Sequence, residues 1–305
     1  MPDNNLSLKE IEKLGYYDFM SYVGTPFFHV GGLKSSLELA GLCRIKSASK
    51  VLIVGCGSGL SACFLAKKLK CHVIGLDIAE VSIKKAKERA KRELLEDQAE
   101  FLTGSAYGLP FEAETFDAVI TEFVSQSLNQ TRAFEEFVRV LKPSGYVGIN
   151  ELFKKQNIPS NIAEEILSAQ RLVQEATGLE FNIYSKDDWS AWLEKSGLKK
   201  VQVNEYSKYV KIDELPEYND QISINELPEY NDYITIKELP RIFAVGKNLI
   251  KIISLKHNRK MFKYLILSQI IRNRYKKIRT FKAVLFRNKT TSGYVGCVLG
   301  IGQKG

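Results

Sequence analysis

Val51-Leu52-Ile53-Val54-Gly55-Cys56-Gly57-Ser58-Gly59 is the most informative stretch of this 305-residue chain. The apolar residues before Gly55 predict a buried parallel strand, and residues 60–69 predict a helix, so the glycines occupy a strand-to-helix turn. Without Cβ atoms, glycines permit tight backbone dihedrals and let a ligand lie directly against main-chain N–H groups. The turn therefore predicts a cofactor site at Gly55, Gly57 and Gly59.

A second predicted strand, His72-Val73-Ile74-Gly75-Leu76-Asp77, ends in an acid. A carboxylate at the carboxyl end of this strand can accept hydrogen bonds from both hydroxyls of a ribose. Charge-assisted hydrogen bonds of this kind contribute about 1.5–3 kcal/mol each. We therefore expect Asp77 to bind the ribose of the cofactor.

The glycine spacing distinguishes two groups of cofactor-binding folds. Nicotinamide-binding folds use G-x-G-x-x-G at this place, whereas this turn has the spacing G-x-G-x-G. The latter spacing, with an acid ending the next strand, resembles the class I S-adenosylmethionine-dependent methyltransferases. Three later segments resemble that family in the same order: Gly104-Ser105-Ala106-Tyr107-Gly108-Leu109-Pro110-Phe111, then Thr115-Phe116-Asp117-Ala118-Val119-Ile120, then Arg139-Val140-Leu141-Lys142-Pro143-Ser144-Gly145-Tyr146.

The resemblance implies an α/β fold: a doubly wound, mainly parallel seven-stranded sheet with an α-helical insertion before the last strand. It implies S-adenosyl-L-methionine as the cofactor, with the glycines on its methionine portion, Asp77 on its ribose and Ser105 with Ala106 on its adenine. Two positions depart from the family, since Ile53 and Ser105 stand where acids are common, which predicts modest cofactor affinity. The implied cofactor-binding residues are Tyr22, Gly55, Gly57, Gly59, Asp77, Ser105 and Ala106.

Alternating apolar segments and helical patterns support a parallel, doubly wound sheet. By resemblance, the last strand is antiparallel to the others. The predicted strands lie near 50–55, 72–77, 98–103, 116–121, 145–151, 198–206 and 292–303.

The chain divides into an N-terminal helical lid (1–45), a methyltransferase core (46–206 plus 290–305) and an insertion (207–289). The insertion opens with a twelve-residue repeat that begins at Ile212, which we interpret as a duplicated surface loop. Residues 242–289 predict basic amphipathic helices that could cover the substrate pocket, lie on a membrane surface or contact an acidic protein. They contain no uncharged run of the ~20 residues that cross a bilayer.

The composition is typical of a globular protein, with 45% apolar and 26% charged residues. The five cysteines show no C-x-x-C pair or zinc spacing, and the first residues lack a signal-peptide pattern. These features predict a cytoplasmic protein, peripheral to a membrane if the basic helices bind lipid. No metal-ligand cluster is predicted.

Three residues are candidates for the chemistry. Ligands of open α/β sheets lie beyond the carboxyl ends of the strands, so Glu122, after the fourth strand, and Glu151, after the fifth, are expected at the site. Either acid could orient or deprotonate an acceptor, attract a cationic amine, or serve only as a salt-bridged rim residue. His29, in a Gly- and Pro-rich loop, is a candidate general base or a residue that holds the lid.

These observations predict a methyltransferase that acts on a small-molecule or lipid-like acceptor, with quinone and phosphoethanolamine-type enzymes as the nearest resemblance. One alternative is a protein or peptide methyltransferase that docks an acidic target through the basic helices. Another is a cofactor-binding protein without transfer activity. The stretch Glu122-Phe123-Val124 differs from the Asn/Asp-Pro-Pro-Tyr/Phe pattern of amino-directed DNA enzymes, which argues against nucleic acid.

Overall fold

The computed structural model describes residues 6–24, 29, 31–206, 263–286 and 288–305. The predicted twelve-residue repeat and the first part of the basic segment, up to residue 262, lie outside these ranges.

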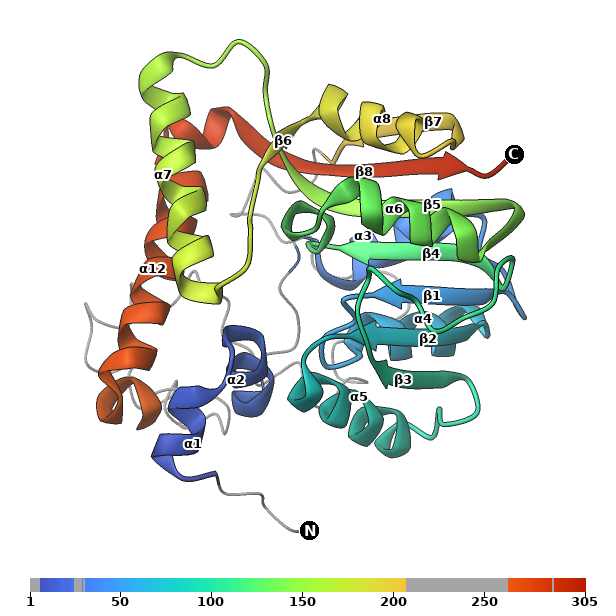
Figure 1. Cartoon of the computed structure of the whole chain (residues 1–305), viewed down its shortest axis with the longest axis horizontal. Helices are drawn as coiled ribbons and strands as arrows, with labels where there is room; N and C mark the ends of the chain where they lie inside the picture. Colours follow the sequence, from blue (N-terminus) through green and yellow to red (C-terminus); the bar gives the residue numbers. More distant parts are fainter. Residues whose placement is uncertain (1–5, 25–28, 30, 207–262, 287) are drawn as a thin grey trace.

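One mainly parallel sheet organises the molecule (Figure 1), and its strands follow the order β3-β2-β1-β4-β5-β8-β7. The last strand, β8, runs antiparallel to both of its neighbours, β5 and β7. The predicted doubly wound sheet with an antiparallel final strand is thus confirmed. The strands are β1 (Lys50–Val54), β2 (His72–Asp77), β3 (Ala99–Thr103), β4 (Phe116–Glu122), β5 (Leu141–Lys154), β7 (Lys199–Glu205) and β8 (Val295–Gln303).

A short additional strand, β6 (Tyr184–Ser185), pairs with the end of β5 and was not predicted. It leads directly into α8 (Lys186–Lys195), which begins with a capping box between Ser185 and Asp188. The start of β8 also differs from prediction, since residues 291–293 form a 3₁₀ turn, η5 (Thr291–Gly293).

Helices cover both faces of the sheet because residues of each central strand alternate between two cores. In β1, Val51 and Ile53 belong to the core beneath α3, α4 and α5, whereas Leu52 and Val54 belong to the core beneath α6 and α8. The covering helices are α3 (Gly32–Leu42), α4 (Leu60–Leu69), α5 (Glu80–Arg92), α6 (Gln130–Val140) and α8.

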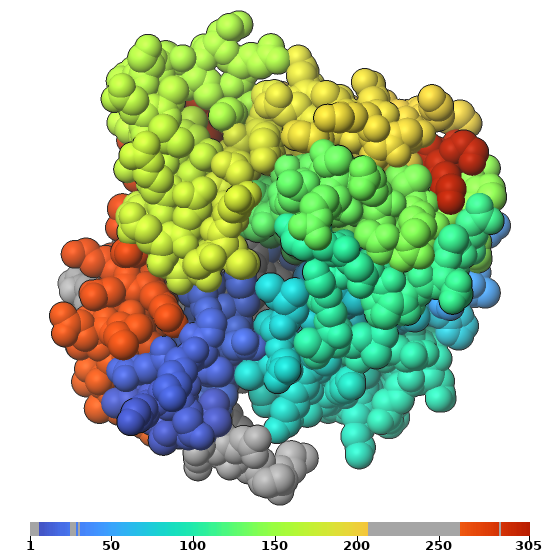
Figure 2. Space-filling view, in the orientation of Figure 1, coloured from blue at the N-terminus to red at the C-terminus, as the bar shows by residue number. Residues whose placement is uncertain are grey.

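A separate helical layer stands at the edge where the parallel strands end (Figure 1). It consists of α1 (Leu8–Lys13), α2 (Tyr16–Val23), α7 (Ser160–Thr177) and α12 (Gln269–Phe286). The expected helical insertion before the last strand is therefore present as α12, which packs along α7. Figure 2 shows the N-terminal helices in blue and α12 in orange forming one continuous surface.

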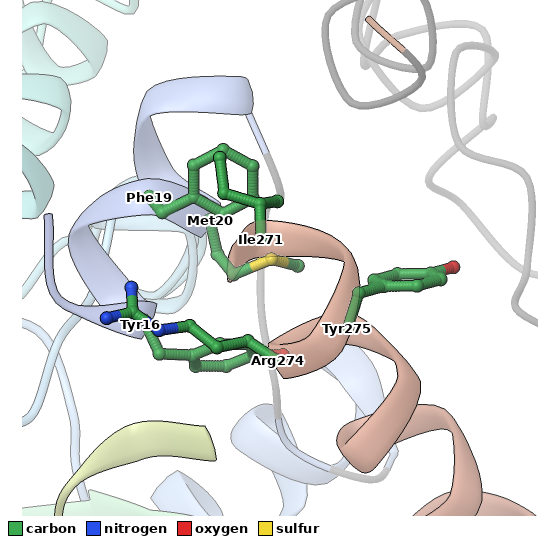
Figure 3. Close-up of a pocket in the computed structure, with 6 residues that line it drawn as sticks. All are labelled: Tyr16, Phe19, Met20, Ile271, Arg274 and Tyr275. Atoms are coloured by element: carbon green, nitrogen blue, oxygen red, sulfur yellow. The ribbon is translucent and has the colours of Figure 1, made fainter. Parts of the chain in front are cut away.

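Specific contacts hold α12 within this layer. The Lys277 ammonium lies 2.7 Å from the Glu175 carboxylate of α7, and the rings of Phe281 and Phe181 meet edge to face at 5.4 Å. A small pocket between α2 and α12 (Figure 3) shows that their apolar side chains face one another without complete packing; its lining residues are Tyr16, Phe19, Met20, Ile271, Arg274 and Tyr275.

Among the helices that the structure describes, none combines the length and apolar character needed to cross a membrane.

Candidate functional site

The glycine turn forms the centre of the candidate site. Gly55, Gly57 and Gly59 all have positive φ angles, of 72°, 53° and 76°, which L side chains rarely adopt. A Cβ atom on Gly55 would lie 2.2 Å from Val124, and one on Gly59 would lie 2.8 Å from Ala86. A Cβ on Gly57 would meet nothing within 4 Å, so the middle of the turn is open to a ligand.

Asp77 is fixed next to this open position. Its Oδ2 accepts a hydrogen bond of 2.8 Å from the Gly57 amide, and its Oδ1 accepts one of 2.9 Å from the Ala79 amide. Burial raises the pKa of the carboxyl group, and the two amides oppose this increase. Each oxygen keeps a lone pair for a further donor, so the residue suits a pair of hydroxyl groups.

The predicted adenine-side residues follow β3. The Gly104 amide donates to the Asp77 carbonyl at 3.0 Å, which joins this segment to the end of β2. Ser105 is exposed, and its Oγ accepts a 3.2 Å hydrogen bond from the Tyr107 amide, while Ala106 is buried. The structure thus brings Ser105 and Ala106 to the same edge as Asp77.

Glu122 and His29 lie in a buried polar cluster on the α3 side of β4. Glu122 Oε1 accepts a 2.8 Å hydrogen bond from Ser36 Oγ and lies 3.6 Å from His29 Nδ1. The other ring nitrogen of His29 lies 3.2 Å from Ser61 Oγ, in the first turn of α4. The structure therefore joins the predicted loop histidine to the fourth-strand acid, a pairing that spacing along the chain does not indicate.

Glu151 occupies a different environment, and it lies within β5 rather than after the fifth strand as predicted, because pairing with β8 extends β5 to Lys154. Its Oε1 accepts hydrogen bonds from the amides of Val124 and Ser125, at 3.1 and 2.8 Å, and from Thr121 Oγ1 at 3.3 Å. Its Oε2 is buried and has no hydrogen-bond partner among the described residues. Burial raises the pKa of Glu151 to about 7, so the group can both hold and release a proton near neutrality.

Two tyrosines of α2 bear on the site in different ways. The predicted Tyr22 is half-buried, and its hydroxyl lies 3.4 Å from that of Tyr264, so it joins α2 to the segment before α12. Tyr17 was not predicted as a site residue. Burial, followed by the charges of Asp77 and Glu151, raises its pKa to about 12, which places it within electrostatic range of both acids. In the sequence, Tyr17 is one of several aromatic residues between positions 16 and 22, and no motif sets it apart from the others.

Residues 52–149, which contain the glycine turn, Asp77 and Glu122, match the family described as "Methyltransferase domain". The chain is a class I S-adenosylmethionine-dependent methyltransferase. Its cofactor is S-adenosyl-L-methionine. The residues of this site fit the cofactor. The Asp77 carboxylate can accept hydrogen bonds from the two ribose hydroxyls, and the open space at Gly57 lets the ligand lie against the main chain of the turn.

Two relatives of known activity resemble this methyltransferase in sequence. One is the glycine/sarcosine/dimethylglycine N-methyltransferase of Actinopolyspora halophila, 30% identical over 57% of this chain and 30% of the relative. The other is the erythromycin 3''-O-methyltransferase of Saccharopolyspora erythraea, 31% identical over 54% of this chain and 56% of the relative. The aligned region thus spans less than two thirds of either relative's own length.

A solved structure with a similar fold is phosphoethanolamine N-methyltransferase 2 of Haemonchus contortus in complex with S-adenosyl-L-methionine. The TM-score is 0.61 at 16% identity, and the match covers 100% of this chain and 61% of the other. At this identity the similarity concerns the fold alone.

Proposed function

We propose that this methyltransferase acts on a small-molecule or lipid-like acceptor that is enclosed beneath the helical layer. The observation that carries the proposal is the connection between the N-terminal helices and the residue 263–286 segment. Ser268 Oγ donates to Glu12 at 2.6 Å, Arg274 donates to the Leu14 carbonyl at 2.7 Å, and Tyr264 packs against Phe19. A layer joined in this way over the ends of the strands favours an acceptor small enough to lie beneath it.

The relatives support the same class of acceptor. By their names, one methylates glycine and its N-methyl derivatives, and the other methylates an oxygen of erythromycin. Both are small molecules, although they present different nucleophiles. They therefore support a small acceptor and leave open whether the methyl group goes to nitrogen, oxygen or carbon.

We assign roles to the residues of this chain accordingly. The bound cofactor supplies an electrophilic methyl group on a sulfonium, and much of the rate comes from holding the acceptor in line with it. Asp77 binds the ribose, and Ser105 with Ala106 faces the adenine. Glu151 is the candidate acid–base residue on the strength of its pKa of about 7, although its carboxylate is fully buried in this structure. His29, whose Nε2 lies 3.2 Å from Ser61 Oγ, is the second candidate base.

The domain organisation completes the proposal. Within residues 1–45, helices α1 and α2 act as a lid together with α12 of the insertion 207–289, whereas α3 packs on the sheet of the catalytic core, which residues 46–206 plus 290–305 form. The contacts between Glu12 and Ser268 and between Tyr22 and Tyr264 join the two lid segments.

The experiment is incubation of the purified chain with methyl-labelled cofactor and a fractionated extract. Label in the small-molecule or lipid fraction supports the proposal. Label confined to protein would instead support the alternative, a protein methyltransferase that docks an acidic target. No transfer to any fraction, with the cofactor bound, would favour a cofactor-binding protein without transfer activity.

One observation favours that protein-directed alternative. Arg272, Lys276 and Arg279 are exposed on α12, and the described part of the chain from residue 263 onward contains no acid. A basic surface attracts acidic partners, and the attraction weakens as salt screens it. Transfer to an acidic protein that falls steeply between low and physiological salt would identify this activity.

A further inference from the structure

Three acids, Asp77 at the end of β2, Glu122 at the end of β4 and Glu151 within β5, differ in what their carboxylate oxygens contact. Both oxygens of Asp77 accept backbone amides, from Gly57 and Ala79. Glu151 is fully buried, and its Oε1 accepts two amides of the 3₁₀ segment that follows β4. Glu122 has all its hydrogen bonds on Oε1, and within the described residues Oε2 has none.

Glu122 lies beside the first glycine of the turn in the sheet register. Strands β1 and β4 are parallel neighbours in which Val54 lies opposite Thr121, so Glu122 follows opposite Gly55, as Asp77 does on the β2 side. The Glu122 side chain is only 5% exposed, yet Oε2 is not among the fully buried oxygens that lack a partner. Oε2 therefore keeps some exposure at a strand end next to the turn.

The known partners of this carboxylate all lie on Oε1. Ser36 Oγ donates at 2.8 Å, Asn150 Nδ2 lies at 3.5 Å, and His29 Nδ1 lies at 3.6 Å, within ion-pair distance. His29 supplies positive charge there only when it is protonated. Because a nearly buried carboxylate is stabilised by a cation, Oε2 is the oxygen on which a ligand could supply one.

The bound cofactor carries such a cation. Its amino-acid end has an α-ammonium, which needs acceptors, whereas the N–H groups of the glycine turn can only donate. We propose that Glu122 receives the α-ammonium of the cofactor through Oε2, with Ser36 and Asn150 fixing the carboxylate. The inference rests on the proposed function, and it assigns Glu122 to the cofactor rather than to the methyl acceptor, as the sequence had left open.

The test compares two ligands that differ at the amino-acid end. S-adenosylhomocysteine carries the α-ammonium, whereas 5'-methylthioadenosine has the same adenosine but no amino acid. Calorimetric titration of Glu122→Gln should show affinity for S-adenosylhomocysteine reduced by about tenfold or more, with affinity for methylthioadenosine within about twofold of wild type. Asp77→Asn, which alters the ribose contact, should weaken both ligands.

Glu96→Gln is the matched control, because Glu96 is exposed in the turn between α5 and β3 and its substitution removes the same charge. It should bind both ligands as the wild type does. Thermal denaturation of Glu122→Gln establishes that the variant is folded; if it is not, Ser36→Ala, which removes only the donor to Oε1, should show the same ligand preference at a few-fold level.

Equal losses for both ligands, or no loss for either, would overturn the assignment of Glu122 while leaving cofactor binding intact. Wild-type protein that bound neither ligand would overturn the proposed function itself. An unchanged affinity for S-adenosylhomocysteine with a raised KM for an amine acceptor would place Glu122 on the acceptor instead.

Discussion

The Gly57 amide donates a 2.8 Å hydrogen bond to Oδ2 of Asp77, which ties the turn after β1 to the end of β2. The two features that the sequence indicated most strongly are therefore one structural unit. A ligand bound against the open face of Gly57 would therefore also contact the carboxylate of Asp77.

Substitution of Asp77 tests this unit. We expect Asp77→Ala to weaken binding of S-adenosylhomocysteine by about tenfold or more, because one or two charge-assisted hydrogen bonds are lost. Calorimetry measures the affinity. The control is Asp97→Asn, since Asp97 is exposed in the turn before β3. Unchanged affinity of the Asp77 variant would remove this residue from the cofactor site.

Two glycines of the turn should respond differently to alanine. A Cβ on Gly59 would lie 2.8 Å from both Ala86 and the Phe101 ring, so Gly59→Ala should lower the free energy of unfolding by about 2–4 kcal/mol. A Cβ on Gly57 meets open space, so Gly57→Ala should cost only about 1–2 kcal/mol. It should nevertheless lose most of its cofactor affinity, because the methyl group enters the ligand position. Chemical denaturation and calorimetry measure the two effects, and the reverse pattern would contradict the site.

Glu151 should make stability depend on pH. Its pKa is raised by burial from 4.5 to about 7, so the folded protein binds more protons than the unfolded chain between these values. Stability from this group is complete below about pH 4.5 and is lost as pH rises through about 7. The loss is on the order of 3 kcal/mol. Glu151→Gln lacks the titrating group and should not show this loss. The Tm of the variant minus the Tm of the wild type should therefore increase from pH 5 to pH 8, by the shift in Tm that this loss of stability produces. If the Tm values of the variant and the wild type change with pH in parallel, the pKa of Glu151 is not raised in the folded protein.

Tyr264 tests the connection between the lid segments. It is buried, packs its ring against Phe19 at 6.0 Å, and lies near the Tyr22 hydroxyl. Tyr264→Ala should lower the free energy of unfolding by about 3–5 kcal/mol, and Tyr264→Phe, which keeps the ring, by less than about 1 kcal/mol. If both variants unfold as the wild type does, the segment is not anchored at this residue.

The sequence predicted the parts of the molecule that depend on local pattern. The helix 60–69 and the strand ending in Asp77 were located to the residue, because apolar periodicity and glycine punctuation mark their ends. The last strand began later than predicted, since glycine content does not separate a 3₁₀ turn from a strand.

The environments of the two acids could not be predicted, because they depend on partners far away in sequence. Glu122 is held by Ser36, 86 residues earlier, and Glu151 by amides of a segment that adopts its conformation only in the folded sheet. Tyr17 likewise meets Asp77 and Glu151 only through the packing of α2. The sequence pattern predicted that both acids lie toward one edge of the sheet. Their different hydrogen-bond partners come from tertiary contacts that the pattern does not show.

A crystal structure of the complex with S-adenosylhomocysteine tests the central claim most directly. The account predicts the ribose hydroxyls within about 2.6–3.2 Å of the Asp77 carboxylate, with the adenosyl group over the open face of Gly57. Density for the ligand away from the glycine turn, or a ribose without contact to Asp77, would contradict it.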